Sequence, residues 1–249
     1  MIRAVRALAV LALVTCSLLA PGVRAAEPVD LLLVLASDVS RSVDNAKFKL
    51  QREGYASAIA NPQVLEAISS GVHRRIAVCF VEWSGSTSQK VLIEWTLISD
   101  SASARQFGDR LLETPRAFAD RTSISAAIEF SMAQFDRAMF QATRRTIDVS
   151  GDGTNNSGRD VGIVRDEAVG NGVTINGLVI LSERAIPWNP EHTNPPGGLA
   201  SYYRDHVMGG PGAFVIVAQD FNAFGQAIVK KLIAEIAMLP QPSGGLLPR

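Results

Sequence analysis

An apolar run near the start of the chain ends in three oxygen-bearing side chains at alternate positions. Leu31 to Ala36 has the composition of a buried strand, and Asp38, Ser40 and Ser42 follow it. A carboxylate and two hydroxyls at the carboxyl end of a strand form a compact all-oxygen site, which a hard divalent cation such as Mg²⁺ requires. The alternative is that these residues only cap the following helix and turn.

Two later segments carry the same kind of side chain. Arg121-Thr122-Ser123 stands at the entrance of an expected helix, and Asp152 follows a short apolar strand. In a doubly wound sheet, ligands gather at the carboxyl ends of the strands, where the strand order reverses. We therefore expect the loops that hold Asp38 and Asp152 to flank one crevice, with the helix-entry segment beside them.

Alternating strand-like and helix-period segments predict the elements that position these loops. The strand candidates are 29–37, 75–83, 90–96, 146–150, 173–181 and 213–218. The helix candidates are 44–60, 101–113, 123–137, 158–170 and 221–238. Only Gly85-Ser86-Thr87-Ser88 separates the second strand from the third, so these two should form a hairpin. The sequence predicts one α/β domain, with a doubly wound, mainly parallel six-stranded sheet, one antiparallel edge strand and helices on both faces.

The combination of DxSxS, a helix-entry Thr and a strand-end Asp-Gly resembles the metal-ion-dependent adhesion site of von Willebrand factor type A (vWA) domains. The resemblance covers nearly the whole mature chain, and it is strongest to a group of exported bacterial proteins described only as a domain of unknown function. It implies that Ser40 and Ser42 bind Mg²⁺ or Mn²⁺ directly, and that Asp38 does so directly or through water. Thr122 and Asp152 fit the remaining two protein positions.

Two positions depart from the pattern of these domains. Gly151 stands where many relatives have Thr, and Thr122 is followed by Ser123 rather than by a Gly-containing run. The sequence therefore leaves open whether Thr122 or Ser123 faces the ion.

Neutral hydroxyl ligands leave the charge of a cation incompletely cancelled, so that it can attract a carboxylate. The resemblance thus implies a non-enzymatic, cation-dependent module that binds an Asp or Glu of a protein partner. Two alternatives remain open: a metal-dependent periplasmic hydrolase or phosphotransferase that uses Asp38, and a metal-free structural module. A phosphatase of the haloacid-dehalogenase type needs a second Asp where Ser40 stands. His73, His192 and His206 follow no catalytic or zinc motif, and we expect structural roles for them.

The first 25 residues have the pattern of a signal peptide. Arg3 and Arg6 precede an apolar run, and Val23-Arg24-Ala25 supplies the small residues that a signal peptidase needs. We expect a periplasmic or secreted protein with no membrane span, a vWA-like domain over 27–239 and a flexible tail over 240–249. The alternative is a lipoprotein anchored through Cys16.

Composition limits the partners further. The 24 basic and 24 acidic residues balance, and no basic block indicates nucleic-acid binding or a polybasic membrane patch. We expect a monomer without a disulfide, because Cys79 lies alone in an apolar run. The segment 182–198 is either a partner-recognition loop with Trp188 as its anchor or a Pro-stiffened surface loop.

Overall fold

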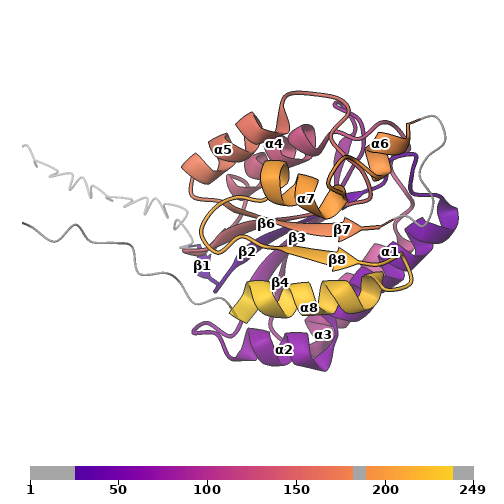
Figure 1. Ribbon diagram of the computed structural model, residues 1–249. Helices are drawn as coiled ribbons and strands as arrows, with labels where there is room; N and C mark the ends of the chain where they lie inside the picture. Colours follow the sequence, from indigo (N-terminus) through magenta and orange to yellow (C-terminus); the bar gives the residue numbers. More distant parts are fainter. Residues whose placement is uncertain (1–25, 182–188, 238–249) are drawn as a thin grey trace, which may run out of the picture.

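The computed structural model describes residues 26–181 and 189–237. A six-stranded sheet with the order β4-β3-β2-β6-β7-β8 forms its centre (Figure 1). Its strands are β2 (Leu32–Asp38), β3 (Ile76–Trp83), β4 (Gln89–Ile98), β6 (Arg145–Gly151), β7 (Thr174–Ile180) and β8 (Val215–Ala218). All neighbours are parallel except β3 and β4, which form the expected hairpin at one edge. The predicted fold class is confirmed.

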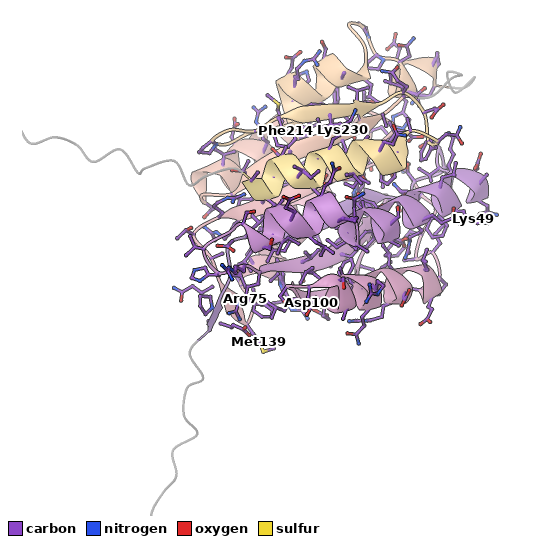
Figure 2. The ribbon with its side chains drawn as sticks, turned by 90° about the horizontal axis from the view of Figure 1, so that it is seen from below. Lys49, Arg75, Asp100, Met139, Phe214 and Lys230 are labelled. Carbon is purple, nitrogen blue, oxygen red and sulfur yellow. The ribbon has the colours of Figure 1, made fainter. Side chains whose placement is uncertain are left out.

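Helices cover both faces of the sheet (Figure 1). One face packs against α1 (Asn45–Ile59), α2 (Pro62–Ser69), α3 (Ser101–Glu113) and α8 (Phe224–Ala237). The other face packs against α4 (Ile124–Phe135), α5 (Val161–Gly170), α7 (Leu199–Tyr202) and the π-helical turn η1 (Tyr203–Val207). Seen from below, α1 lies alongside α8 (Figure 2). Three shorter elements complete the described chain: β1 (Glu27–Pro28), its partner β5 (Phe140–Gln141) and α6 (Pro190–Thr193).

The central strand β2 is buried on both faces, which explains its continuous apolar sequence. Leu33 and Leu35 belong to the core under α1 and α8, whereas Val34 and Ala36 belong to the core under α4 and α5. Cys79 of β3 is free and fully buried as expected, and burial raises the pKa of its thiol to about 12.

Polar side chains set several helix starts. Asp44 accepts a hydrogen bond from the backbone nitrogen of Lys47 (2.9 Å) and caps α1, as its sequence position suggests. The predicted helix 158–170 begins later, at Val161, because Asp160 is its N-cap. Likewise, α8 begins at Phe224 rather than at 221. The sequence analysis did not predict α2, α6 or the β1–β5 pair, all of which are short.

Several sequence predictions fall on parts of the chain outside the described residues. They are the signal peptide with Cys16, the loop residue Trp188 and the tail 240–249. Among the residues that the structure describes, no helix has the length and apolar character needed to cross a membrane.

Candidate metal centre

The sheet register brings the predicted loops to one point. β2 lies between β3 and β6, so the strand order reverses there. Ser37 of β2 pairs with Ser150 of β6, and the loops after both strands therefore leave the sheet side by side. The third loop joins through the backbone, because the Ser123 nitrogen donates to the Ser84 carbonyl after β3 (2.7 Å) and the Arg41 nitrogen donates to the Asp120 carbonyl (3.0 Å).

Four of the five predicted site residues form one hydrogen-bonded cluster. The Ser40 nitrogen donates to Asp38 Oδ1 (2.7 Å), and the hydroxyl oxygens of Ser40 and Ser42 lie 3.0 Å apart. The Ser42 hydroxyl in turn donates to Asp152 Oδ1. Asp38, Ser40 and Asp152 are buried, and Ser42 is half-buried. The strand-end carboxylates and the two serines thus meet as the sequence predicts.

The structure places Thr122, rather than Ser123, at the site. Thr122 and Ser42 line the same cavity of about 370 Å³. Ser123 is not among the residues that line this cavity, and its hydroxyl instead caps α4 by accepting from the Ala126 nitrogen (3.3 Å). The Thr122 hydroxyl is therefore the one available to a ligand in the cavity.

The two carboxylates are poorly compensated by other charges. Burial raises the pKa of Asp38 to about 7, and the nearby Asp152 carboxylate adds to this. Burial also raises the pKa of Asp152, against the opposing effects of the Ser42 hydrogen bond and of Lys47. The Lys47 ammonium lies 3.6 Å from Asp152 Oδ2, but its side chain is 27% exposed. Asp38 Oδ2 has no hydrogen-bond partner among the described residues.

These donors fit a small divalent cation. Neighbouring ligands of an octahedral Mg²⁺ are about 3 Å apart, because each bond is roughly 2.0–2.1 Å long. The spacing of 3.0 Å between the Ser40 and Ser42 hydroxyl oxygens agrees with this. Within the described ranges, no three His, Cys, Asp or Glu side chains gather to hold a metal. The candidate donors are instead two carboxylates and three hydroxyls, which is the oxygen chemistry of Mg²⁺ or Mn²⁺ rather than of a thiolate or multi-histidine site.

The glycine that departs from the vWA pattern has a local cause. A Cβ atom on Gly151 would lie 2.5 Å from the Tyr203 hydroxyl and 3.1 Å from Asp38 Oδ2. Tyr203 comes from η1 and is fully buried. The space that a larger residue would need before Asp152 is therefore filled by a tyrosine from a distant segment.

Three supporting residues were not found from the sequence. The Asn156 side chain accepts from the Thr122 nitrogen (3.0 Å), and the Asn156 nitrogen donates to the Thr122 carbonyl (2.9 Å). Arg116 donates to the carbonyls of Val39 (2.6 Å) and Ser40 (2.9 Å). His192 of α6 reaches the Thr122 hydroxyl with Nε2 at 3.2 Å. No motif marks these residues, since each acts through a contact between segments far apart in sequence.

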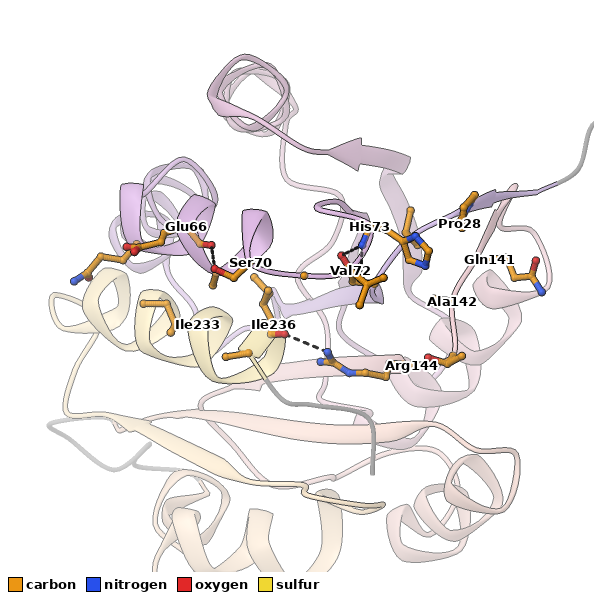
Figure 3. Close-up of a pocket in the computed structure, with 17 residues that line it drawn as sticks. Pro28, Glu66, Ser70, Val72, His73, Gln141, Ala142, Arg144, Ile233 and Ile236 are labelled. Atoms are coloured by element: carbon orange, nitrogen blue, oxygen red, sulfur yellow. Dashed lines mark hydrogen bonds between the residues drawn. The ribbon is translucent and has the colours of Figure 1, made fainter. Parts of the chain in front are cut away.

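A larger cavity lies at the amino ends of the central strands β2 and β6, the end opposite the candidate site (Figure 3). It measures about 790 Å³ and contains none of the predicted site residues. Its lining includes apolar Val72, Ile233 and Ile236. The guanidinium of Arg144 there donates to the Ile236 carbonyl (3.1 Å) and so caps the end of α8. Size alone therefore does not single out the candidate site, because the predicted residues Ser42 and Thr122 line the smaller cavity.

Comparison with solved structures confirms the vWA fold. Proximal thread matrix protein 1 from the mussel byssus matches with a TM-score of 0.58 and 12% identity, over 86% of this chain and 47% of that one. The same protein with a zinc-occupied MIDAS motif matches with 0.55 and 13%, over 83% and 45%. A von Willebrand factor type A structure from Catenulispora acidiphila matches with 0.54 and 15%, over 84% and 43%.

At these identities the likeness establishes the fold alone, and the chain spans a little under half the length of these three solved chains. No curated protein sequence matches it. A family model described as "Protein of unknown function (DUF1194)" matches residues 28–240, which is most of the 249-residue sequence. The chain is therefore a vWA-fold member of the DUF1194 family.

Proposed function

We propose that this chain is a divalent-cation-dependent protein-binding module. Asp38, Ser40, Ser42, Thr122 and Asp152 would hold Mg²⁺ or Mn²⁺, and the ion would engage an Asp or Glu of a partner protein. The observation that carries this proposal is the pair of buried carboxylates, each with one oxygen that has no hydrogen-bond partner among the described residues, beside hydroxyls at ligand spacing. The vWA fold and the zinc-occupied MIDAS motif of the mussel matrix protein support it.

Each part of the site has a role in this proposal. The hydroxyls would contribute oxygen ligands without negative charge, so the bound cation would supply a positive centre open to an incoming carboxylate. Arg116 holds the Ser40 backbone through its carbonyl, and Asn156 holds Thr122 from both sides of the peptide. These contacts fix the ligand-bearing loops before any ion arrives, which lowers the entropy that binding must remove.

The entrance to the site favours an acidic partner. The cavity of about 370 Å³ is lined by Arg41 and Arg121 as well as by Ser42 and Thr122. Both arginines are exposed, and Asp120 is the one carboxylate among the lining residues. A guanidinium is well suited to carboxylate recognition, and a positive entrance raises the rate at which anionic groups arrive.

We further propose that the protein acts outside the cytoplasm as a monomer. The support is the signal-peptide pattern at 1–25 and the closed core over the described part of 27–239. A partner would then be an exported or surface protein.

A capture experiment tests this function. The mature protein is immobilised and exposed to periplasmic extract in Mg²⁺ or in EDTA, beside Ser40→Ala and the control Asp109→Ala, which replaces an exposed carboxylate of α3. We expect a partner that binds to wild type and to Asp109→Ala in Mg²⁺, and that is lost both in EDTA and with Ser40→Ala. Equal capture under all four conditions would contradict the proposal, as would hydrolysis of a phosphate-ester substrate that depends on Asp38.

A further inference from the structure

A lysine from the first turn of α1 lies beside the proposed cation site. The Lys47 ammonium is 3.6 Å from Asp152 Oδ2 and donates to the Ser42 carbonyl (2.8 Å). It also lies 5.1 Å from the centre of the Phe221 ring, a distance at which a cation and an aromatic face attract each other. One ammonium therefore lies against two of the residues that we propose as cation ligands.

The position of Lys47 in the helix is electrostatically unfavourable in itself. Helix α1 begins at Asn45, so Lys47 lies in its first turn, where the helix dipole disfavours a positive charge. That turn contains no acidic residue. The N-cap Asp44 accepts from the Lys47 backbone nitrogen, whereas the ion pair of the Lys47 ammonium is with Asp152. The local sequence therefore does not account for a lysine here, but the buried carboxylate of Asp152 does.

The ammonium offsets only part of the charge that is buried at this site. Asp38 and Asp152 carry two negative charges when both are ionised, and Lys47 supplies one positive charge. A divalent cation would supply two. An ion bound between the carboxylates and the serine hydroxyls would also repel the ammonium that already lies beside Asp152, because both are positive. The ion and the ammonium are therefore alternative partners for the same carboxylate.

We propose, on the basis of the function proposed above, that Lys47 is an internal competitor of the cation. Its ammonium offsets the charge of Asp152 while no ion is bound, and binding of an ion weakens its contacts with Asp152 and Ser42. Lys47 is not among the residues that line the cavity, so it competes for the charge of Asp152 rather than for the space. The cost of displacing the ammonium lowers the affinity of the site for divalent cations.

The lysine side chain can leave Asp152 without disturbing the core. It is partly exposed, whereas the Asp152 side chain is fully buried. The separation of 3.6 Å between the ammonium and Oδ2 is longer than a direct hydrogen bond, so this contact is loose. The carboxylates cannot move in the same way, because Asp38 ends β2 and Asp152 directly follows β6. The ammonium is therefore the part of the site that yields to an ion.

This competition links the ion to the partner. With Lys47 beside Asp152, the ion alone is held weakly, and a carboxylate from the partner adds the negative charge that stabilises it. The ion and the partner should then bind cooperatively, and each should raise the affinity for the other by the same factor. Lys47 would thus make occupancy of the site depend on the presence of the partner.

Isothermal titration calorimetry of the mature protein with Mg²⁺, at one pH and ionic strength, tests this proposal. We expect Lys47→Met and Lys47→Gln to bind Mg²⁺ about tenfold more tightly than wild type, which corresponds to about 1.4 kcal/mol. Lys47→Arg keeps the charge and should bind as wild type does. The matched control is Lys49→Met, which should also match wild type. Lys49 is an exposed lysine of the same helix, and it pairs with Glu53 (3.8 Å) instead of with the site (Figure 2).

The possible failures are distinguishable. Unchanged or weaker binding by the two neutral variants would overturn the role of Lys47, and the proposed function would still stand if Asp38→Asn abolishes binding. Tighter binding by only one neutral variant would also overturn this role, because the charge is absent from both. No Mg²⁺ binding by wild type or by any variant would overturn both proposals. Should Lys47→Met fail to fold, Lys47→Gln alone decides.

Discussion

The domain buries two pairs of carboxylates, which differ in the positive charge that lies beside them. On the α8 side of the sheet, Asp148 and Glu235 share the ammonium of Lys231, whose Nζ lies 2.9 Å from Asp148 Oδ1 and pairs with Glu235 as well. These three side chains are at most 1% exposed. At the carboxyl end of the strands, Asp38 and Asp152 are equally buried, but the nearest ammonium is that of the partly exposed Lys47.

We call Asp148 and Glu235 the inner pair, and Asp38 and Asp152, for which we propose cation binding, the outer pair. Burying an ionised carboxylate without a partner is costly, and an ammonium from the chain offsets that cost at the inner pair. At the outer pair, the nearest ammonium is that of the partly exposed Lys47, and the Ser42 hydroxyl donates to Asp152. We infer that the counter-ion of the outer pair comes from solution.

The largest expected effect is on the inner pair. Lys231→Met keeps the size of the side chain but leaves Asp148 and Glu235 without their ammonium. We expect the free energy of unfolding to fall by about 3–5 kcal/mol, because one partner of a buried ion pair has been removed. Urea denaturation measures this change.

The matched control for this variant is Lys230→Met, which removes an exposed lysine from the same helix (Figure 2). Its effect should stay within roughly 0.5 kcal/mol. A similar loss in both variants would mean that the inner ion pair has no special role. Added Mg²⁺ should stabilise Lys231→Met as much as it stabilises wild type.

The dependence of stability on pH comes next in size. Burial raises the pKa of Asp148 from 3.8 to about 7, with Glu235 adding to this effect and Lys231 opposing it. Between about pH 4 and about pH 7 the folded state therefore holds a proton that the unfolded chain has released. The free energy of unfolding should fall as pH rises through this window, by at most about 4 kcal/mol.

Metal and mutation separate the two carboxylate pairs in this titration. Asp38 has the same direction of shift, so both pairs contribute in EDTA. Saturating Mg²⁺ should remove the contribution of Asp38, and Asp148→Asn should remove most of what remains. Denaturation curves across the pH range provide the check. A pH dependence that Mg²⁺ leaves unchanged would contradict the contrast between the pairs.

A smaller effect is expected from crowding the outer pair. Gly151→Ala places a methyl group against the Tyr203 hydroxyl and Asp38 Oδ2. Overpacking of this kind costs about 1–3 kcal/mol, and here it also displaces a proposed ligand. Calorimetry should show weaker Mg²⁺ binding. Gly170→Ala is the control, because a Cβ atom there meets no atom within 4 Å.

The Cys79 thiol should not react with thiol reagents in the native protein. Its thiol is fully buried in β3, and burial raises its pKa to about 12, so neither access nor a thiolate favours reaction. Ellman's reagent should label it only after denaturant is added, with or without Mg²⁺. Rapid labelling of the native protein would show that the sheet opens more readily than the buried core implies.

The fold and the convergence of the proposed oxygen ligands were predictable because their signals are local. Continuous apolar strands give the parallel sheet, and DxSxS directly follows one of them. The sequence could not show which hydroxyl, that of Thr122 or that of Ser123, lies at the candidate site. The answer depends on tertiary structure, because Ser123 caps α4 while Thr122 lines the cavity.

The contacts that support the candidate site could not be predicted from the sequence, for a different reason. His192 and Tyr203 reach the site from segments well beyond Asp152, and no spacing rule connects them to it. The inner ion pair is similar, because Lys231 and Glu235 read as ordinary helix residues until α8 packs on β6. Only the tertiary packing shows that their charges are buried together.

Isothermal titration calorimetry with Mg²⁺ tests the central claim most directly. The purified mature domain is compared with Asp38→Asn, which keeps the shape of the side chain and removes its charge, and with Asp109→Asn as the exposed control on α3. We expect one ion per chain to bind to wild type and to Asp109→Asn, and none to Asp38→Asn. The absence of binding to wild type, or equal binding by all three proteins, would contradict the assignment of the outer carboxylate pair as a cation site.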